Sequence, residues 1–152
     1  MLFEMMVKTV TVDKAGSFLV LLTDEDDKKV LPISIGPFEA QAIAMVLQGK
    51  APPRPLTHDL LKSMCENLGG NLEKVVITDI QDSTFYSELY LNYKDQTLIV
   101  DSRPSDAIAF ALRCGVGIYM LPKMVEFTYD YSDLISQQND EDEDEGSDEN
   151  LY

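Results

Sequence analysis

The chain reads Gly36-Pro37-Phe38-Glu39-Ala40-Gln41-Ala42-Ile43-Ala44 and then, 67 residues later, Arg103-Pro104-Ser105-Asp106-Ala107-Ile108-Ala109-Phe110-Ala111. Each stretch predicts a helix that begins at its proline. Proline suits the first helical turn, and the negative charge of an acid in that turn interacts favourably with the positive end of the helix dipole. The same offset relates residues further upstream, where Thr11, Phe18, Leu22 and Leu31 recur as Thr78, Phe85, Leu89 and Leu98. The pattern indicates two copies of one supersecondary unit that close on each other in one domain.

Three strand-like segments precede each proline. They cover residues 5–12, 17–22 and 30–35 in the first unit and 72–80, 85–92 and 98–101 in the second, and they are β-branched, apolar or alternating. Residues 57–68 predict an extra helix between the units, capped by Thr57 and stopped by two glycines. Residues 116–121 predict a last strand, and residues 122–135 a short helix. We therefore expect an α+β fold in which internally duplicated β-β-β-α units form one domain, residues 1–135, with a mostly antiparallel, curved sheet.

Composition sets the class of protein. The formal charge is −15, and eight of the 27 acids lie between residues 140 and 149, so the rest of the chain has 19 acids against 12 bases. Such a run predicts an acidic, disordered tail over residues 136–152. No apolar run is long enough to span a membrane, and the start of the chain lacks the features of a signal peptide. We expect a cytoplasmic protein with reduced cysteines and no membrane partner.

The first candidate site is the run Arg54-Pro55-Leu56-Thr57-His58-Asp59. It places a stiff loop before a helix start, where free backbone N–H groups favour an anion such as phosphate, so Arg54 and Thr57 are candidate substrate contacts. Histidine ordinarily titrates near neutral pH, which makes His58 a candidate general base or acid with Asp59 orienting it or binding a metal. Helix capping alone explains the same residues and stays open as the alternative.

The second candidate site is the run Asp101-Ser102-Arg103-Pro104-Ser105-Asp106. Arg103 offers a planar donor fork suited to phosphate, with Ser105 beside it. The carboxylates of Glu39, Asp101 and Asp106 are candidate ligands for Mg²⁺ or Mn²⁺, which would activate water against a phosphodiester, with Asp106 also a catalytic candidate. No organic cofactor is expected. The alternative is again structural, because equivalent helix starts need equivalent acids.

Other chemistries find less support. Serine-histidine-aspartate hydrolysis lacks a GxSxG elbow, and no phosphate-binding P-loop or GxGxxG run is present. Tyr86 and Tyr90 share one strand face that stacking of bases would use, but packing against a partner subunit explains them better. Basic residues are few, so any contact with nucleic acid is expected to be weak and transient.

Three segments together resemble the bifunctional nuclease domain family. They are Val30-Leu31-Pro32-Ile33-Ser34-Ile35-Gly36 running into Glu39-Ala40, the run from Arg54 to Leu61, and the run from Asp101 to Ala109. The resemblance covers about residues 5–125 and implies a single α+β domain, self-association as a homo-oligomer, with a dimer favoured, and nuclease activity on DNA and RNA. The competing hypothesis is a non-catalytic, self-associating interaction or regulatory domain.

Overall fold

The structure is a computed structural model, and it describes residues 1–136. The predicted acidic tail therefore lies outside the described residues, Ser136 apart. Along the chain the elements follow the predicted order, with β-β-β-α, a further helix, a second β-β-β-α and a closing segment. Their bounds are β1 Phe3–Val12, β2 Phe18–Thr23, β3 Lys29–Ile35, α1 Pro37–Leu47, α2 Thr57–Asn67, β4 Gly70–Gln81, β5 Thr84–Tyr93, β6 Gln96–Ser102, α3 Pro104–Cys114, β7 Gly117–Met120, the 3₁₀ helix η1 Pro122–Phe127 and β8 Tyr129–Asp130.

The strands of residues 1–136 form one eight-stranded sheet in the order β6-β5-β4-β7-β1-β2-β3-β8. Neighbouring strands are antiparallel except β4 and β7, which run parallel. Strand β7 therefore joins the two three-stranded meanders, pairing with β4 on one side and β1 on the other. The predicted α+β class and mostly antiparallel sheet are confirmed. The internal duplication of β-β-β-α units stays a prediction.

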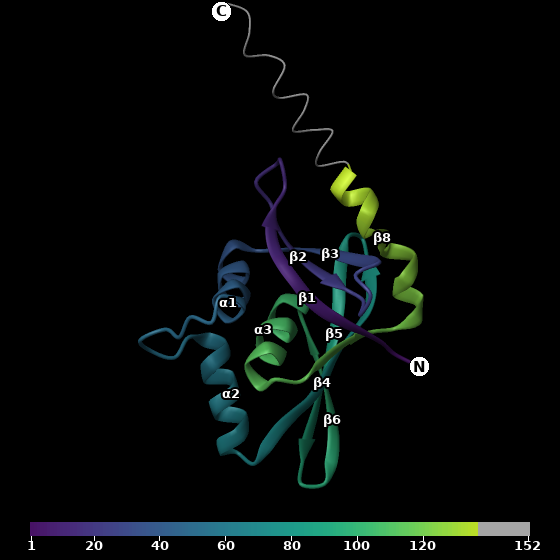
Figure 1. Ribbon diagram of the computed structural model, residues 1–152. Coiled ribbons are helices and arrows are strands. Elements are labelled where there is room, and N and C mark those ends of the chain that lie inside the picture. The colour runs from purple at the N-terminus through teal and green to yellow at the C-terminus, as the bar shows by residue number, and fades with distance from the viewer. Residues whose placement is uncertain (137–152) are drawn as a thin grey trace, which may run out of the picture.

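Helices α1, α2 and α3 gather beside one another (Figure 1), and α3 contacts both of the others as well as β4, β5 and β7. Helix α3 is the most buried of the three, with every residue from Ala107 to Ala111 buried. Gly115 ends it in the left-handed conformation, with φ 67°, which glycine adopts without strain. The core of large, fully buried side chains draws on both units: Leu22, Leu31, Ile33, Ile43, Ile77, Ile108 and Phe110.

One local expectation needs correction. Thr57 is the first helical residue of α2 and not its cap, which is Leu56. The short helix predicted within residues 122–135 is confirmed, as the 3₁₀ helix η1 and a further helical stretch over residues 131–136, with the short edge strand β8 between them. Proline has no backbone N–H to donate, so in a sheet it occurs mostly on edge strands or at bulges. Pro32 lies in β3, but only Lys29 and Val30 of that strand pair with β8. The missing N–H of Pro32 therefore costs no hydrogen bond between β3 and β8.

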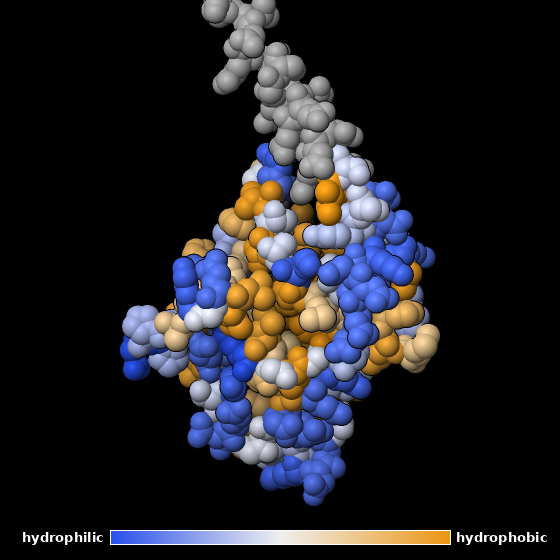
Figure 2. All heavy atoms as spheres, viewed as in Figure 1, coloured by the Kyte–Doolittle hydropathy of each residue, from blue (hydrophilic) through white to orange (hydrophobic). Residues whose placement is uncertain are grey.

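The surface is uneven in polarity. Figure 2 shows hydrophobic side chains across the middle of one face, where Figure 1 places α3 and β1, with hydrophilic side chains around them.

Cys65 and Cys114 are free thiols. In residues 1–136 no helix has both the length and the apolar character needed to cross a membrane.

Candidate functional site

The first turns of α1, α2 and α3 border one open hollow of about 650 Å³. The two prolines of the repeat begin α1 and α3, and packing between these helices brings their first turns together with that of α2. The predicted motifs at the starts of the three helices, which lie far apart in the sequence, therefore meet at this hollow. Its lining residues are Phe38, Glu39, Gln41, Ala42, Pro55, Leu56, Thr57, His58, Leu60, Arg103 and Asp106.

Arg103 links the two units of the repeat. Its Nε donates to Asp106 Oδ2 at 2.8 Å and its Nη2 to Asp106 Oδ1 at 3.1 Å. The same Nη2 lies 3.3 Å from Glu39 Oε1, and Glu39 and Asp106 occupy equivalent positions of the two units. Gly36 makes room for this arrangement, because a Cβ there would collide with the Glu39 carboxylate. One cation therefore holds both acids at the hollow.

His58 makes the third contact. Its Nε2 lies 2.9 Å from Asp106 Oδ1, and the residue is only 8% exposed. A carboxylate that is ionised at neutral pH accepts hydrogen bonds only, so Nε2 carries a proton and donates this hydrogen bond. In the neutral tautomer that makes this bond, the lone pair is on Nδ1. This tautomer leaves Nδ1 as the basic atom of the imidazole.

The contacts between Asp106, Arg103 and His58 shift the pKa values of the two charged groups. Burial on its own raises the pKa of Asp106, but hydrogen bonds from Arg103 and His58 outweigh it and hold that pKa below its ordinary value. The hydrogen bond to Asp106 raises the pKa of the Arg103 guanidinium, and the charge of Glu39 adds to this. Asp106 is therefore an anion, and Arg103 a cation, across the physiological range.

Asp59 turns to a different partner than expected. Its Oδ2 accepts the backbone N–H of Leu56 at 2.9 Å, which closes the first turn of α2, and its Oδ1 accepts Arg113 Nε at 2.8 Å. The pKa of Asp59 is lowered first by the Leu56 bond and then, against burial, by Arg113. The carboxylate that orients His58 is accordingly Asp106 and not Asp59. Sequence could not choose between them, because the two acids lie 47 residues apart and either could face the ring.

Arg113 fastens the three helices together. Its side chain is 6% exposed and joins Asp59 of α2 to backbone carbonyls of α1 and α3, with Nη2 3.0 Å from Ala42 O and Nη1 2.9 Å from Ala109 O. Lys62 of α2 adds a 3.0 Å bond to the Arg113 carbonyl. We class Arg113 as a positioning residue, since it sets where α2 presents His58.

The other predicted site residues divide between the hollow and its surroundings. Thr57 lines the hollow, whereas Arg54 lies in the exposed loop before α2. Ser105 is buried behind the first turn of α3, and Asp101 lies on exposed β6; neither lines the hollow. Sequence reasoning missed the apolar rim of Phe38, Leu56 and Leu60 and the buried role of Arg113. The signal for Phe38 was available, since it directly precedes Glu39 at a predicted helix start.

The predicted metal ligands do not form a metal-binding set in this arrangement. Asp106 engages both of its oxygens with Arg103 and His58, and Glu39 faces the same arginine. Asp101 does not reach the hollow. Across residues 1–136 no three histidine, cysteine, aspartate or glutamate side chains come together as a metal would need. A magnesium or manganese ion at Glu39, Asp101 and Asp106 stays a prediction.

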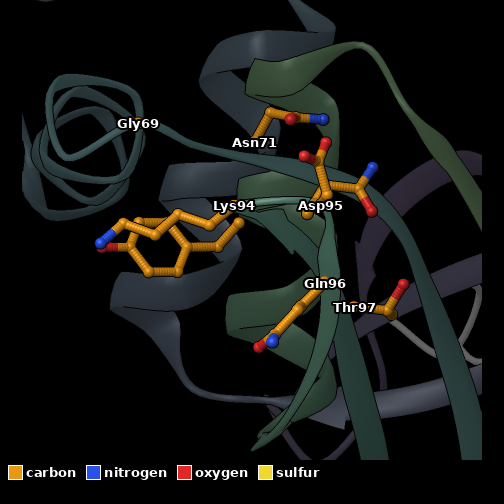
Figure 3. A pocket seen from close by; sticks show the side chains of 8 residues that line it. Gly69, Asn71, Lys94, Asp95, Gln96 and Thr97 are labelled. Carbon is orange, nitrogen blue, oxygen red and sulfur yellow. The ribbon is translucent and has the colours of Figure 1, made fainter.

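A second hollow, of about 460 Å³, lies beside the turn between β5 and β6. Figure 3 shows Asn71 and Asp95 turned toward each other there, with Gln96 and Thr97 further along β6. Lys94 places its ammonium 5.1 Å from the centre of the Tyr93 ring. This hollow has no histidine or arginine and no paired carboxylates in its lining. The hollow at the three helix starts is therefore the stronger candidate for chemistry.

Comparison with known proteins identifies the family. The family model described as the bifunctional nuclease domain matches residues 20–129, which is well over half of the chain. The chain belongs to the bifunctional nuclease domain family. The matched residues contain the entire lining of the hollow, so the site lies wholly inside the bifunctional nuclease domain.

Individual relatives share this domain. An uncharacterized protein of Mycobacterium tuberculosis is 47% identical over 102 residues, which make up 67% of this chain and 60% of the relative. Bifunctional nuclease 1 of Oryza sativa subsp. japonica is 33% identical over 110 residues, 70% of this chain and 33% of the relative. Bifunctional nuclease 2 of Arabidopsis thaliana is 29% identical over 105 residues, 67% of this chain and 32% of the relative. The chain thus matches less than two thirds of the length of each relative.

The bifunctional nuclease domain is expected to lose stability in acid through its own site. Asp59 and Asp106 both have a lowered pKa in the folded chain, against an ordinary value of 3.8. Such groups stabilise the fold fully above the unfolded pKa, and their contribution is lost as pH falls through the folded pKa. The free energy of unfolding in urea, followed by circular dichroism, should therefore decline as pH falls through 3.8 and below. The Asp106→Asn variant should show a shallower decline; an unchanged slope would contradict this account.

Proposed function

We propose that the chain hydrolyses phosphodiester bonds of DNA and RNA in the hollow at the three helix starts. The observation that supports this most is the carboxylate of Asp106, which contacts His58 and Arg103 at once. It pairs a candidate base with a candidate phosphate ligand inside one concave site. Family membership and the plant relatives named bifunctional nucleases support the same reaction.

The roles follow from the contacts. Asp106 would hold the Nε2–H of His58, so that Nδ1 takes a proton from water as the water oxygen bonds to phosphorus. The bond from phosphorus to the leaving oxygen breaks, that oxygen takes up a proton from solvent, and His58 releases to solvent the proton that Nδ1 received. Arg103, whose side chain is 65% exposed, would exchange part of its contact with Glu39 for a phosphate oxygen and stabilise the charge that develops there.

Electrostatics predict a weak encounter with substrate. Arg103 faces two carboxylates in the hollow, and the chain carries a formal charge of −15. Proteins that bind nucleic acid tightly neutralise many phosphates with lysine and arginine, and their affinity depends steeply on salt. We therefore propose transient, sequence-independent binding with a shallow salt dependence.

The direct test is a hydrolysis assay of the full chain on labelled single-stranded DNA and RNA. Parallel reactions contain magnesium, manganese or a chelator, because a requirement for metal would support the ion that the sequence predicts. The His58→Ala variant, purified in the same way, controls for contaminating nucleases. Activity of the wild type above this variant supports the proposal; equal rates for both proteins would overturn it.

Self-association is favoured by the free edge of the sheet. Strand β6 is the first of the sheet order, so its outer edge has no strand partner in residues 1–136, and it exposes Leu98, Ile99 and Val100. Exposed apolar residues of α2 and of its C-cap, among them Leu61 and Met64 of the helix and Leu68 at the cap, border a neighbouring groove of about 400 Å³. We propose a second copy as the occupant. Antiparallel pairing centred on Ile99 would set Asp101 opposite Thr97 of the other copy, which avoids facing like charges.

The Ile99→Lys variant is expected to be monomeric where the wild type is a dimer. A lysine on the free edge blocks strand pairing, and Ile99 is 57% exposed, so the fold of the single chain should tolerate the change. Light scattering across the micromolar range, with circular dichroism to confirm folding, measures the effect. Val12→Lys is a matched control, since Val12 is 53% exposed and lies on β1. A monomeric wild type would overturn the proposed interface.

A further inference from the structure

The most exposed aromatic ring beside the hollow is that of Phe38. It is 82% exposed, although it lies in the first turn of α1 and directly precedes Glu39, whose side chain is only 19% exposed. The two neighbours therefore differ in direction, with the carboxylate engaged by Arg103 and the ring left at the rim. Leaving a large ring in water forgoes a burial that would stabilise the fold.

The rim around Phe38 is apolar as a whole. Leu56 and Leu60 of the α2 start are 40% and 53% exposed, and both line the same hollow. Inside this rim lie the charged groups Glu39, Arg103 and Asp106. A ligand that fits must present an apolar face next to a phosphate-sized anion, which describes a nucleotide with its base unpaired.

Affinity considerations lead to the same ligand. One arginine against two carboxylates supplies no net attraction for phosphate, so another contact must contribute. Stacking of a base on an aromatic ring is that contact in proteins that bind single strands, and it tolerates any base because every base has a flat face. In a duplex these faces are covered by neighbouring base pairs, and exposing one costs free energy.

We infer that Phe38 is a stacking platform for an unpaired base and that the site therefore acts on single-stranded nucleic acid in preference to duplex. The inference rests on the proposed function for its reaction, but the binding contact stands apart from catalysis. With a base on Phe38, the adjacent phosphate lies toward Arg103, and a volume of about 650 Å³ suits one or two nucleotides rather than a double helix.

A single tryptophan tests the contact without any need for activity. The chain has no tryptophan, so Phe38→Trp introduces the only indole, and stacking on a base quenches its fluorescence. Titration with a short thymidine oligonucleotide should quench the indole emission saturably, whereas the same strand in a duplex and an abasic strand should not. The matched control is Tyr129→Trp, which places an indole at a position that is 57% exposed and away from this hollow. Equal quenching of both variants would overturn the inference.

Kinetics provide the second arm. Phe38→Ala should raise KM for a single strand about 5- to 150-fold with a smaller change in kcat, as expected for loss of one stacked base, and Phe38→Tyr should restore KM. If hydrolysis continues while Phe38→Ala leaves KM unchanged, the stacking role is wrong and the proposed function stands. If the indole signal of the Phe38→Trp variant saturates with single strands but the wild type hydrolyses nothing, the binding site is supported and the nuclease proposal fails.

Discussion

Replacing His58 by alanine is expected to lower the rate of phosphodiester hydrolysis by roughly 10²–10⁴-fold, the usual contribution of a positioned general base. The imidazole of His58 lines the hollow, and Asp106 Oδ1 fixes its orientation at 2.9 Å from Nε2. The loss should appear in kcat, because the ring is buried behind the rim and contributes little to binding. Initial rates on a labelled oligonucleotide, with the fold checked by circular dichroism, measure the change.

Matched carboxylate variants make this prediction specific. Asp106→Asn keeps the size of the side chain but removes the charge that orients His58 and pairs with Arg103, so we expect a loss similar to that of His58→Ala. Asp101→Asn makes the same chemical change five residues earlier, outside the hollow, and should leave the rate within about twofold. If Asp101→Asn abolishes a metal-dependent activity, the metal set predicted from the sequence is supported. If His58→Ala and Asp106→Asn both keep the wild-type rate, the assigned roles are wrong.

Replacing Arg113 by alanine is expected to lower the free energy of unfolding by about 3–5 kcal/mol, the range for breaking a buried ion pair by removal of one partner. The change removes the Arg113 donors from Asp59 Oδ1 and from the carbonyls of Ala42 and Ala109, and with them the link between the three helices. Such a loss is a large share of the total, because typical domains are stable by only about 5–15 kcal/mol. Urea unfolding followed by circular dichroism measures the loss.

Arg54→Ala is the control for the arginine series, since Arg54 lies in an exposed loop and the same truncation there should cost less than about 0.5 kcal/mol. At temperatures where the wild type and the variant are both fully folded, Arg113→Ala should also lower kcat more than it raises KM, because α2 no longer holds His58 in the correct position. Arg113→Lys should recover only part of the loss, as lysine lacks the planar fork that reaches three acceptors. A fully stable Arg113→Ala variant would show that the three helices are held by apolar packing alone.

Much of the fold was readable from local pattern. The two proline-acid-alanine runs predicted α1 and α3 at their observed first residues, and the β-branched and alternating runs predicted the strands to within a few residues. These features are local because they depend on helical and strand periods and on the conformational limits of proline. Pairing was harder to foresee. The residue pattern of 117–120 does not predict that β7 runs parallel to β4 and antiparallel to β1. The direction of β7 depends on how α3, which precedes it, crosses the sheet.

The candidate site likewise has some features that follow from neighbouring residues in the sequence and others that depend on tertiary contacts. The sequence by itself determined which residue types meet a helix start, and so marked His58, Arg103, Asp106 and Glu39 as chemistry-bearing. Only the tertiary structure decided that Asp106 partners His58, that Asp59 belongs to Arg113, and that Asp101 stays on the outer strand. The reason is physical: capping and propensity act within one turn of the chain, whereas the pairing of a charge is decided by whichever opposite charge the packing of helices brings within about 3 Å.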